Sequence, residues 1–298
     1  MAGSDSAAFA EGVPCWIDAQ LPDVEAGKRF YGGLFGWTFD PADPADSGDP
    51  ASPASPADPG DSADPGDPGD SADPVGPVGP SEGADPSGVG QWADGPYAGA
   101  VRARLDGEAV AALVPKRDGR MPTVWTVYFA TPDAQDMADR IRKGGGQIVT
   151  TPVPVGPYGV GALAADPEGA VFGLWEAGTH PGFGSRRGTG TFSWVELYAR
   201  DTATADAFYP GLFRDALFGP GATREFGRAH ITDVYPAEMP PHFVVHFGVQ
   251  DCEAALGAVT RLGGRVQAPP FDTSYGRVAV VSDNQGASFA LLQRREEG

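Results

Sequence analysis

The chain has 298 residues, 41% of them hydrophobic, and its formal net charge of −19 makes it strongly acidic. An acidic chain disfavours nucleic acid and anionic membranes as partners, and no apolar stretch approaches the roughly 18 residues of a membrane-spanning helix. The beginning of the sequence lacks the features of a secretion signal, and Cys15 and Cys252 form no Cys-x-x-Cys pair, which suits a reducing compartment. We therefore expect a cytoplasmic protein with no nucleic-acid or membrane partner.

Two strand–helix–hairpin units are predicted in the first half of the chain. In order, they are a strand at 15–20, a helix at 24–35, a hairpin at 97–105 and 108–114, a strand at 123–130, a helix at 133–143 and a hairpin at 159–165 and 170–175. Asp23 is suited to cap the first helix, and turn sequences such as Asp106-Gly107 separate the strands of the hairpins.

Residues 41–90 interrupt this first half. They contain 12 Pro, 10 Asp and Glu82 but no Lys, Arg or aromatic residue. Such a segment buries too little apolar surface to offset the ordering of its backbone, about 1–2 kcal/mol per residue, so we expect a disordered surface insertion. Its 11 acids supply more than half of the net charge, and a tolerated hydrophilic expansion is favoured over a partner-binding role.

The second half repeats the order of elements without the insertion. Its elements begin at Phe192 and Asp201, continue with short strands at 224–226 and 230–235, and end with a strand at 243–248, a helix from Asp251 and strands at 278–282 and 287–292. The expected organisation is a flexible N-terminus at 1–11, a first domain at 12–177, a linker at 178–190 and a second domain at 191–295.

A repeat at constant spacing supports this division. The segment 16–35 recurs at 194–213 with an offset of 178 residues, and 158–169 matches 275–286 with an offset of 117 residues. The chain is therefore interpreted as a tandem duplication. Tyr31 and Tyr209, which the repeat aligns, are expected to be core residues with a polar hydroxyl tip.

Several of these repeated motifs are shared with a known family. They are a strand ending in Asp, a helix carrying Phe-Tyr-x-x-Leu-Phe-Gly-Trp, a Gly-Gly turn after the second helix and a closing Asp-Pro-x-Gly hairpin. In these motifs the chain resembles the vicinal oxygen chelate superfamily, which includes glyoxalase I, bleomycin-resistance proteins and extradiol dioxygenases. More narrowly, it resembles actinobacterial tandem proteins of the glyoxalase-like antigen type, some of them labelled hydroxylases in secondary-metabolite clusters.

The resemblance implies an α+β fold in which four βαβββ units pair into two half-open, eight-stranded barrels, each facing a ligand cavity. Enzymes of the superfamily generally hold a divalent metal there with His or Glu from the first and last strands. In this sequence Trp16 and Trp194 stand at the His positions, and Gly173 and Ala290 at the Glu positions. An indole offers no free lone pair to a metal, so a site without metal or other cofactor is favoured.

A displaced metal site is the alternative. It would use His230, His242 and His246 as fallback ligands. If His242 and His246 lie on one strand, four residues at about 3.3 Å each separate their Cα atoms by roughly 13 Å, which is too far for one ion. Histidines that line or flank a pocket are therefore favoured over a metal centre.

Strand alternation identifies candidate cavity residues. One face of the first strand would carry Trp16, Asp18 and Gln20, and the equivalent face of the second half Trp194, Glu196 and Tyr198. Asp18 and Glu196 are equivalent by the repeat, and a carboxylate in an apolar pocket is a candidate general base or ligand acceptor. The alternative is a carboxylate neutralised by Arg or bonded to the backbone.

Aromatic residues are the expected cavity walls. The candidates for ligand contact are Trp16, Trp125, Trp175 and Trp194, with Gln20, Tyr198 and His246 beside them. Tyr158 and Tyr275 precede Gly in a repeated loop, where a lid or a simple turn is expected.

The function predicted from these features is binding of a small aromatic or amphipathic molecule, as in the bleomycin-resistance branch. The rival is a metal-dependent lyase, isomerase or oxygenase in detoxification or secondary metabolism, and a scaffold with collapsed cavities is a third class. Because the tandem supplies its own internal pairing, a monomer is expected, with a homodimer as the alternative.

Overall fold

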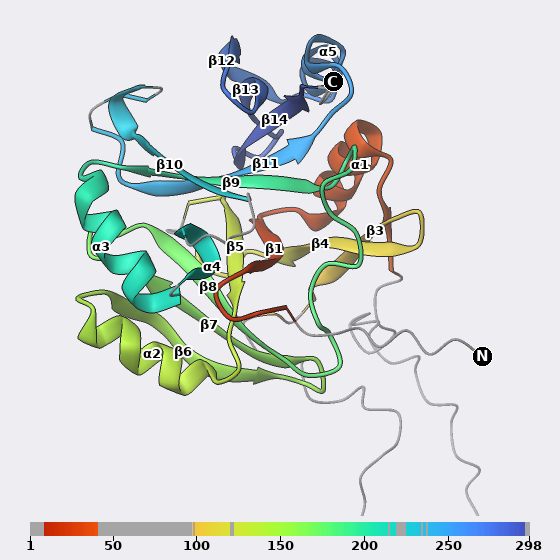
Figure 1. The fold of residues 1–298 in the computed structure, drawn as a ribbon. Helices are drawn as coiled ribbons and strands as arrows, with labels where there is room; N and C mark the ends of the chain where they lie inside the picture. Colours follow the sequence, from red (N-terminus) through yellow and green to blue (C-terminus); the bar gives the residue numbers. More distant parts are fainter. Residues whose placement is uncertain are drawn as a thin grey trace, which may run out of the picture.

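The computed structural model describes residues 9–40, 97, 99–119, 122–213, 215–218, 225–233, 235–236 and 238–295. The predicted insertion at 41–90 and residues 1–8 of the predicted flexible N-terminus lie outside the described residues. Two β-sheets stack on each other, with helices at their flanks (Figure 1). The α+β class and the tandem arrangement are thus confirmed, while the domain limits stay predictions.

The N-terminal sheet has eight strands in the spatial order β2-β3-β4-β1-β5-β8-β7-β6. Its strands are β1 (Pro14–Leu21), β2 (Thr38–Phe39), β3 (Val101–Leu105), β4 (Glu108–Pro115), β5 (Trp125–Ala130), β6 (Gln147–Val155), β7 (Gly159–Ala165) and β8 (Val171–Ala177). Its helices are α1 (Val24–Phe35) and α2 (Ala134–Lys143). At the centre of the sheet β1 pairs with β5 in antiparallel orientation, so the two units of this half meet there.

The C-terminal sheet has six described strands in the order β10-β9-β11-β14-β13-β12. They are β9 (Phe192–Ala199), β10 (Phe226–His230), β11 (His242–Gly248), β12 (Arg265–Asp272), β13 (Gly276–Ser282) and β14 (Ser288–Arg294). The helices are α3 (Thr202–Phe213), the short α4 (Asp215–Phe218), α5 (Cys252–Arg261) and the 3₁₀ turn η2 (Ile231–Asp233). As in the N-terminal sheet, the first strands of the two units, β9 and β11, pair antiparallel at the centre.

The strand assignments differ from the sequence prediction in two places. In place of the predicted strands at 224–226 and 230–235, the described residues form the single strand β10 followed by η2, while residues 224 and 234 lie outside the described residues. Conversely, the Pro-rich segments of β6 and β12 are strands although no strand was predicted there. Both are edge strands, where a proline without an N–H donor is tolerated because no neighbour requires the hydrogen bond.

Aspartates explain where the principal helices begin. Each accepts a backbone N–H of the first helical turn: Asp23 from Ala26, Asp133 from Gln135 and Asp136, Asp201 from Ala203, and Asp251 from Ala254. These bonds satisfy amide groups that have no partner inside the helix. Among the described residues, no helix combines the length and the apolar character needed to cross a membrane.

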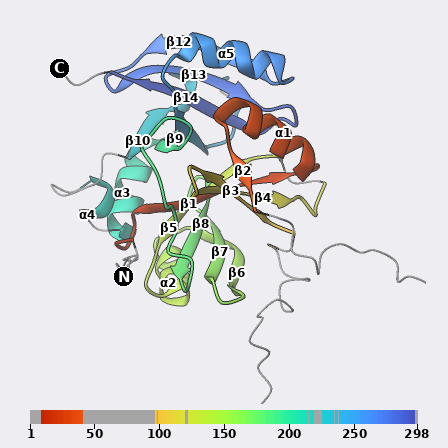
Figure 2. The ribbon, with the colours of Figure 1, turned by 90° about the vertical axis from the view of Figure 1, so that its right-hand side faces the viewer.

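The two sheets pack back to back through their convex faces. Phe129 of β5 contacts Phe213 of α3 and Phe243 of β11, with ring centroids 4.9 and 6.1 Å apart, and Trp125 contacts Phe247 at 5.1 Å. Helix α1 lies beside α5, and α2 beside α3, so each half covers part of the other (Figures 1 and 2). One continuous core results, and the concave face of each sheet points away from the other sheet.

Two equivalent hydrogen bonds connect the halves within this core. The Tyr31 hydroxyl of α1 donates to Asp283 Oδ2 at 2.9 Å, and the Tyr209 hydroxyl of α3 donates to Asp166 Oδ2 at 3.0 Å. The other oxygen of each aspartate accepts two backbone N–H groups of its own turn, which closes the hairpin. Both tyrosines are fully buried, as predicted, and we call the two pairs the Tyr–Asp bridges.

Replacing Tyr209 with Phe keeps the buried ring but removes the donor to Asp166. We expect Tyr209→Phe to lower the free energy of unfolding by about 1.5–3 kcal/mol, the usual value of a hydrogen bond to a charged group, in a urea titration. Tyr235→Phe is the matched control, because the buried Tyr235 hydroxyl has no partner among the described residues. Equal effects of the two substitutions would contradict a stabilising Tyr–Asp bridge.

Candidate functional site

The concave face of the N-terminal sheet holds a chain of hydroxyl and carboxyl groups. Asp18 of β1 is 2% exposed and accepts a hydrogen bond from the Tyr128 hydroxyl of β5 at 2.6 Å. The Tyr128 hydroxyl lies 3.2 Å from that of Tyr97. Trp16 stands opposite Tyr128 in the β1–β5 register, and Asp18 opposite Thr126, so alternation places Asp18 on the same face as Trp16, as predicted.

Burial dominates the electrostatics of Asp18. It raises the pKa of the carboxyl from 3.8 to about 7, although hydrogen bonding to Tyr128 and the nearby Thr126 lowers it. Oδ1 has no hydrogen bond of normal geometry within the described part of the chain. Asp18 is therefore poised to exchange a proton near neutral pH.

Tyrosine rings fill the space where the resemblance places a metal ligand on the last strand. A Cβ added at Gly173 would meet the Tyr128 ring at 2.2 Å, and one added at Gly161 would meet the Tyr97 hydroxyl at 2.7 Å. Glycine is needed at both positions because the rings lie directly on the backbone. A glutamate at position 173 would require Tyr128 to leave its place.

The linker closes part of this face. The His180 ring lies 4.4 Å from the Trp16 ring and 5.7 Å from the Trp175 ring, and the Trp175 indole donates to the His180 carbonyl at 2.8 Å. Phe183 packs against the Trp16 ring at 5.6 Å, while its N–H donates to the Cys15 carbonyl. Burial lowers the pKa of His180 to about 4, so its ring is neutral. Trp16 and Trp175 thus contact the protein's own linker.

The concave face of the C-terminal sheet is arranged differently. Trp194 of β9 is only partly buried and stacks on Tyr275 with ring centroids 4.8 Å apart. Glu196, 6% exposed, accepts the Tyr275 hydroxyl at 2.5 Å and the Trp194 indole N–H at 3.3 Å. Burial raises the pKa of the Glu196 carboxyl, while these two hydrogen bonds lower it. The pair of rings and the carboxylate form one surface that ligands can reach at the partly exposed Trp194.

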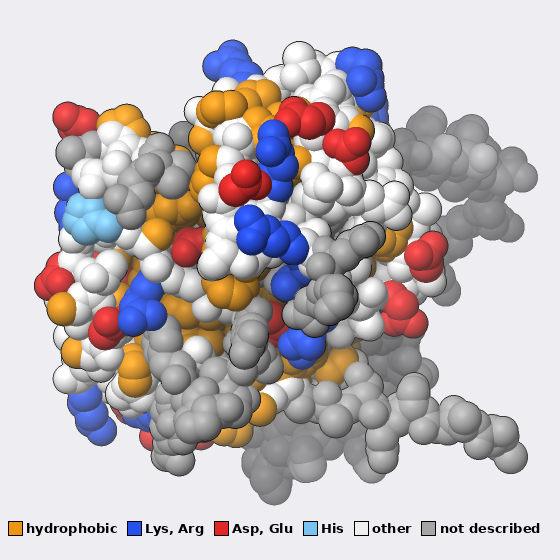
Figure 3. Space-filling view, turned by 45° about the horizontal axis from the view of Figure 1, so that its top comes forward, with side chains coloured by type: hydrophobic (Ala, Val, Ile, Leu, Met, Phe, Trp, Pro, Cys, Tyr) orange, Lys and Arg blue, Asp and Glu red, His pale blue; other side chains and the backbone are white. Residues whose placement is uncertain are grey.

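An apolar cluster extends this surface along the sheet. It consists of Tyr198, Ile231, Tyr235, Val244, Val278, Val280, Ala290 and Leu292, with Trp194 and Tyr275 packed at its border. The His242 ring stacks on Tyr198 at 5.7 Å. On this side of the molecule, hydrophobic side chains gather in a hollow of the surface (Figure 3). We call the cluster and its bordering residues the C-terminal concave face.

His246 lies on this face, opposite Trp194 in the β9–β11 register. It is fully buried, and burial lowers its pKa to about 4, so the ring is neutral. Its Nδ1 lies 3.1 Å from the Val244 carbonyl, which only accepts, so Nδ1 carries the proton and Nε2 is an acceptor. Nε2 has no hydrogen-bond partner among the described residues.

The fallback metal ligands do not converge. His230 is exposed and pairs with Ala199, which places it on the opposite face of the sheet from His242 and His246. His242 is the first residue of β11, and His246 lies four residues further along the same strand. Within the described ranges no three His, Cys, Asp or Glu side chains lie together as a metal site requires. These residues do not fit the divalent-metal centre of the superfamily.

The other residues predicted to form cavity walls lie in different parts of the structure. Trp125 lies on the convex side, where its indole donates to the Tyr31 hydroxyl at 3.0 Å, so it belongs to the core and not to a cavity. Gln20 is half-buried at the end of β1, and Tyr198 belongs to the C-terminal concave face. Sequence analysis missed Tyr128, which the strand register places opposite Trp16 and beside Gly173. The small Gly173 at the expected Glu position was the signal available in the sequence.

Comparison with known proteins gives consistent matches. The Glyoxalase family profile, described as the Glyoxalase/Bleomycin resistance protein/Dioxygenase superfamily, matches residues 16–174. The anthracycline biosynthesis protein DauV of Streptomyces sp. (strain C5) is 34% identical over 97% of this chain and 95% of its own length. DnrV of Streptomyces peucetius, also named an anthracycline biosynthesis protein, is 32% identical over 97% and 95%.

Solved structures agree on the fold. The Mn(II)-bound glyoxalase from Novosphingobium aromaticivorans aligns with a TM-score of 0.53 at 10% identity and covers 96% of this chain and 84% of its own. The 2,3-dioxygenase LapB from Pseudomonas sp. KL28 aligns with a TM-score of 0.53 at 13% identity over 96% and 93%. At such identities the likeness concerns the fold alone.

The raised pKa of Asp18 predicts that the difference in stability between the wild type and an Asp18→Asn variant depends on pH. In the folded chain Asp18 holds its proton up to about pH 7, whereas the unfolded chain releases it near pH 3.8, so its contribution to stability is lost as the pH rises between these values. We expect the stability of the wild type relative to Asp18→Asn to fall between pH 4 and pH 8, as measured by urea unfolding. Asp106→Asn, on an exposed hairpin turn, is the control. A constant difference for Asp18→Asn would contradict the assignment.

Proposed function

Because the chain belongs to the glyoxalase/bleomycin resistance/dioxygenase superfamily, we propose that it binds a small, flat organic molecule on the C-terminal concave face. The observation that carries this proposal is the Trp194–Tyr275 stack with the Glu196 carboxylate bonded to both residues. A partly exposed aromatic surface next to a buried acceptor is suited to a ligand that is flat, largely apolar and equipped with a polar edge.

The polar groups narrow the ligand class. Glu196 accepts hydrogen bonds when it is ionised, and the unprotonated Nε2 of His246 is a second acceptor. Both favour a ligand with hydroxyl or amine donors at one edge. The names of DauV and DnrV, which refer to anthracycline biosynthesis, support a fused-ring aromatic ligand with hydroxyl groups.

The two halves differ in how much room they leave. In the N-terminal half Tyr128 and Tyr97 lie on the backbone glycines, and His180 and Phe183 of the linker cover Trp16. In the C-terminal half the Trp194 ring lies against the backbone at Gly227, where an added Cβ would meet the ring at 2.4 Å. Trp194 nevertheless stays partly exposed. We therefore assign ligand binding to the C-terminal half.

A second candidate function is acid–base catalysis on the same face. The candidate groups for moving a proton to or from a bound ligand are Glu196, with its raised pKa, and the buried His246 Nε2, which has no partner among the described residues. This candidate corresponds to the lyase, isomerase or oxygenase alternative, without a step through a metal. Detection of a new product after incubation with an aromatic ligand would favour it over binding alone.

Matched substitutions of the two repeat-equivalent tryptophans test the proposal. We expect Trp194→Leu to weaken binding of a fused-ring aromatic probe, chosen from a panel that includes an anthracycline, by roughly tenfold or more, because stacking area is lost. Trp16→Leu should leave the affinity unchanged. Isothermal titration calorimetry on variants shown to be folded by circular dichroism provides the measurement. Equal losses, or no binding by the wild type, would contradict the assignment.

Metal analysis addresses the alternative directly. Mass spectrometry on protein purified without a polyhistidine tag and dialysed against Zn²⁺, Ni²⁺, Mn²⁺ and Fe²⁺ should show no stoichiometric retention. Retention that is lost in His246→Ala would contradict the proposal and favour a metal-dependent enzyme. A cytoplasmic location, a monomeric or homodimeric state and the absence of nucleic-acid partners stay predictions from the sequence.

A further inference from the structure

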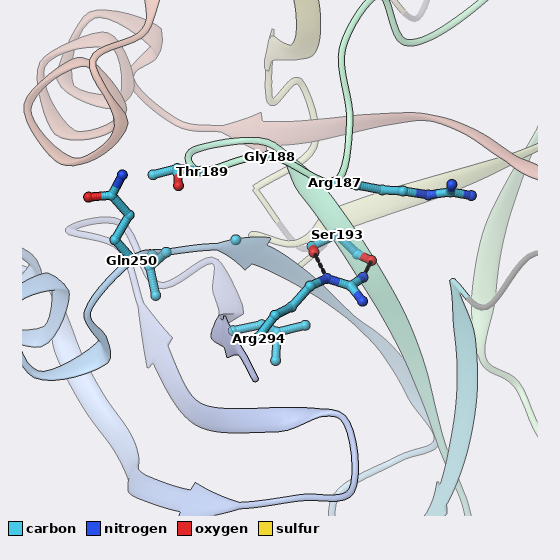
Figure 4. A pocket seen from close by; sticks show the side chains of 9 residues that line it. Arg187, Gly188, Thr189, Ser193, Gln250 and Arg294 are labelled. Carbon is cyan, nitrogen blue, oxygen red and sulfur yellow. Dashed lines mark hydrogen bonds between the residues drawn. The ribbon is translucent and has the colours of Figure 1, made fainter. Parts of the chain in front are cut away.

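A cavity borders the C-terminal concave face where the linker meets the C-terminal sheet. It has a volume of about 410 Å³, within the range of small-molecule sites. The linker contributes Gly188 and Thr189, β9 contributes Ser193, and the segment after β11 contributes Gln250. Arg294, at the end of β14, completes it (Figure 4).

Arg294 is held in place by neutral acceptors. Its Nε donates to Ser193 Oγ at 3.0 Å, and one terminal nitrogen donates to the Ser193 carbonyl at 2.7 Å. Ser193 is fully buried on a central strand, so this contact fixes the guanidinium. Within the described part of the chain Arg294 forms no ion pair within 4.0 Å, whereas Arg277 of the neighbouring strand pairs with Glu253 at 2.8 Å. The charge of Arg294 is therefore oriented without being neutralised by a described carboxylate.

The linker adds further positive charge nearby. Arg186 and Arg187 share a single carboxylate, that of Glu225, which is 1% exposed. The Arg187 side chain extends away from Gln250, toward that partner, so its backbone and stem rather than its guanidinium border the cavity (Figure 4). The two guanidinium groups and the Glu225 carboxylate together carry one positive charge, although the chain as a whole has a net charge of −19.

The other polar side chains that line the cavity are neutral. Thr189 and Gln250 line the side of the cavity opposite Arg294 and Ser193, and the Gln250 side chain extends away from Arg294 (Figure 4). Both side chains are exposed, and both supply neutral hydrogen-bond donors. A guanidinium with unused N–H groups binds carboxylate or phosphate oxygens through charge-assisted hydrogen bonds.

We propose that this cavity binds a small anion, a carboxylate or a phosphate, with Arg294 as its charged anchor. The site is separate from the Trp194–Tyr275 stack and does not depend on the proposed aromatic ligand. Leu292, which belongs to the C-terminal concave face, also lines the cavity, so the two sites are adjacent.

Calorimetric titration of the full chain with benzoate, and separately with inorganic phosphate, tests the proposal. We expect saturable binding of at least one probe, weakened about tenfold or more in Arg294→Gln. Arg277→Gln, also on the C-terminal sheet but paired with Glu253, should leave the affinity unchanged. Tighter binding of benzoate would identify a carboxylate site and tighter binding of phosphate a phosphate site. Binding of neither, or equal losses in both variants, would overturn the proposal.

A measurement on the wild type covers the case in which Arg294→Gln does not fold. Phenylglyoxal modifies accessible arginines, and mass spectrometry locates the modified residues. The bound probe should protect Arg294 and leave Arg277 reactive, and equal reactivity of Arg294 with and without probe would overturn the proposal.

A chain with Glu296→Gln and Glu297→Gln adds a further control. Probe binding that appears only in this chain would show that the C-terminal carboxylates occupy the site, which also overturns it.

Discussion

The exchange of hydrogen bonds between helix tyrosines and turn aspartates constrains the rest of the molecule. Tyr31 reaches the turn at Asp283, and Tyr209 reaches the turn at Asp166, so each half holds a hairpin of the other half in position. Since the bridges join the convex sides, the aromatic core forms there and the concave faces are left for other roles. A tyrosine hydroxyl buried in such a core requires an acceptor, and the turn aspartate satisfies it while also closing its own hairpin.

With both halves fixed in this way, the two concave faces have diverged. Asp18 and Glu196 are equivalent by the repeat and both accept a tyrosine hydroxyl, but the tyrosines come from different places: Tyr128 from the adjacent central strand and Tyr275 from the turn before β13. A tyrosine on the central strand fills the middle of its own face, whereas one from a turn stands at the edge. The carboxylate is therefore enclosed in the N-terminal half, where it is Asp18, and borders an apolar hollow in the C-terminal half, where it is Glu196.

Sequence reasoning was most successful where a local rule determined the structure. Capping aspartates located the helix starts, and the constant offsets revealed the duplication before any contact was known. Alternation correctly placed Asp18 on the face of Trp16 and Glu196 on the face of Trp194. Trp125 was expected in a cavity wall as an aromatic residue, but it lies in the core because the register of β5, which the sequence does not reveal, turns it to the convex side. The anchoring of Arg294 by Ser193 joins residues 101 positions apart, and no local pattern indicates such a contact.

Described residues on either side of the acidic segment are joined by a short ladder. The Asp40 N–H donates to the Arg102 carbonyl at 3.0 Å, its carboxylate binds Arg104 at 2.6 Å, and Thr38 pairs with Arg104 across β2 and β3. The chain therefore leaves and re-enters the sheet at neighbouring points. Because the cost of closing a loop rises only with the logarithm of its length, about 0.6 kcal/mol for each doubling, this junction tolerates large changes in segment length. Such a junction lets evolution lengthen or shorten the segment while both sheets and their bridges stay as they are.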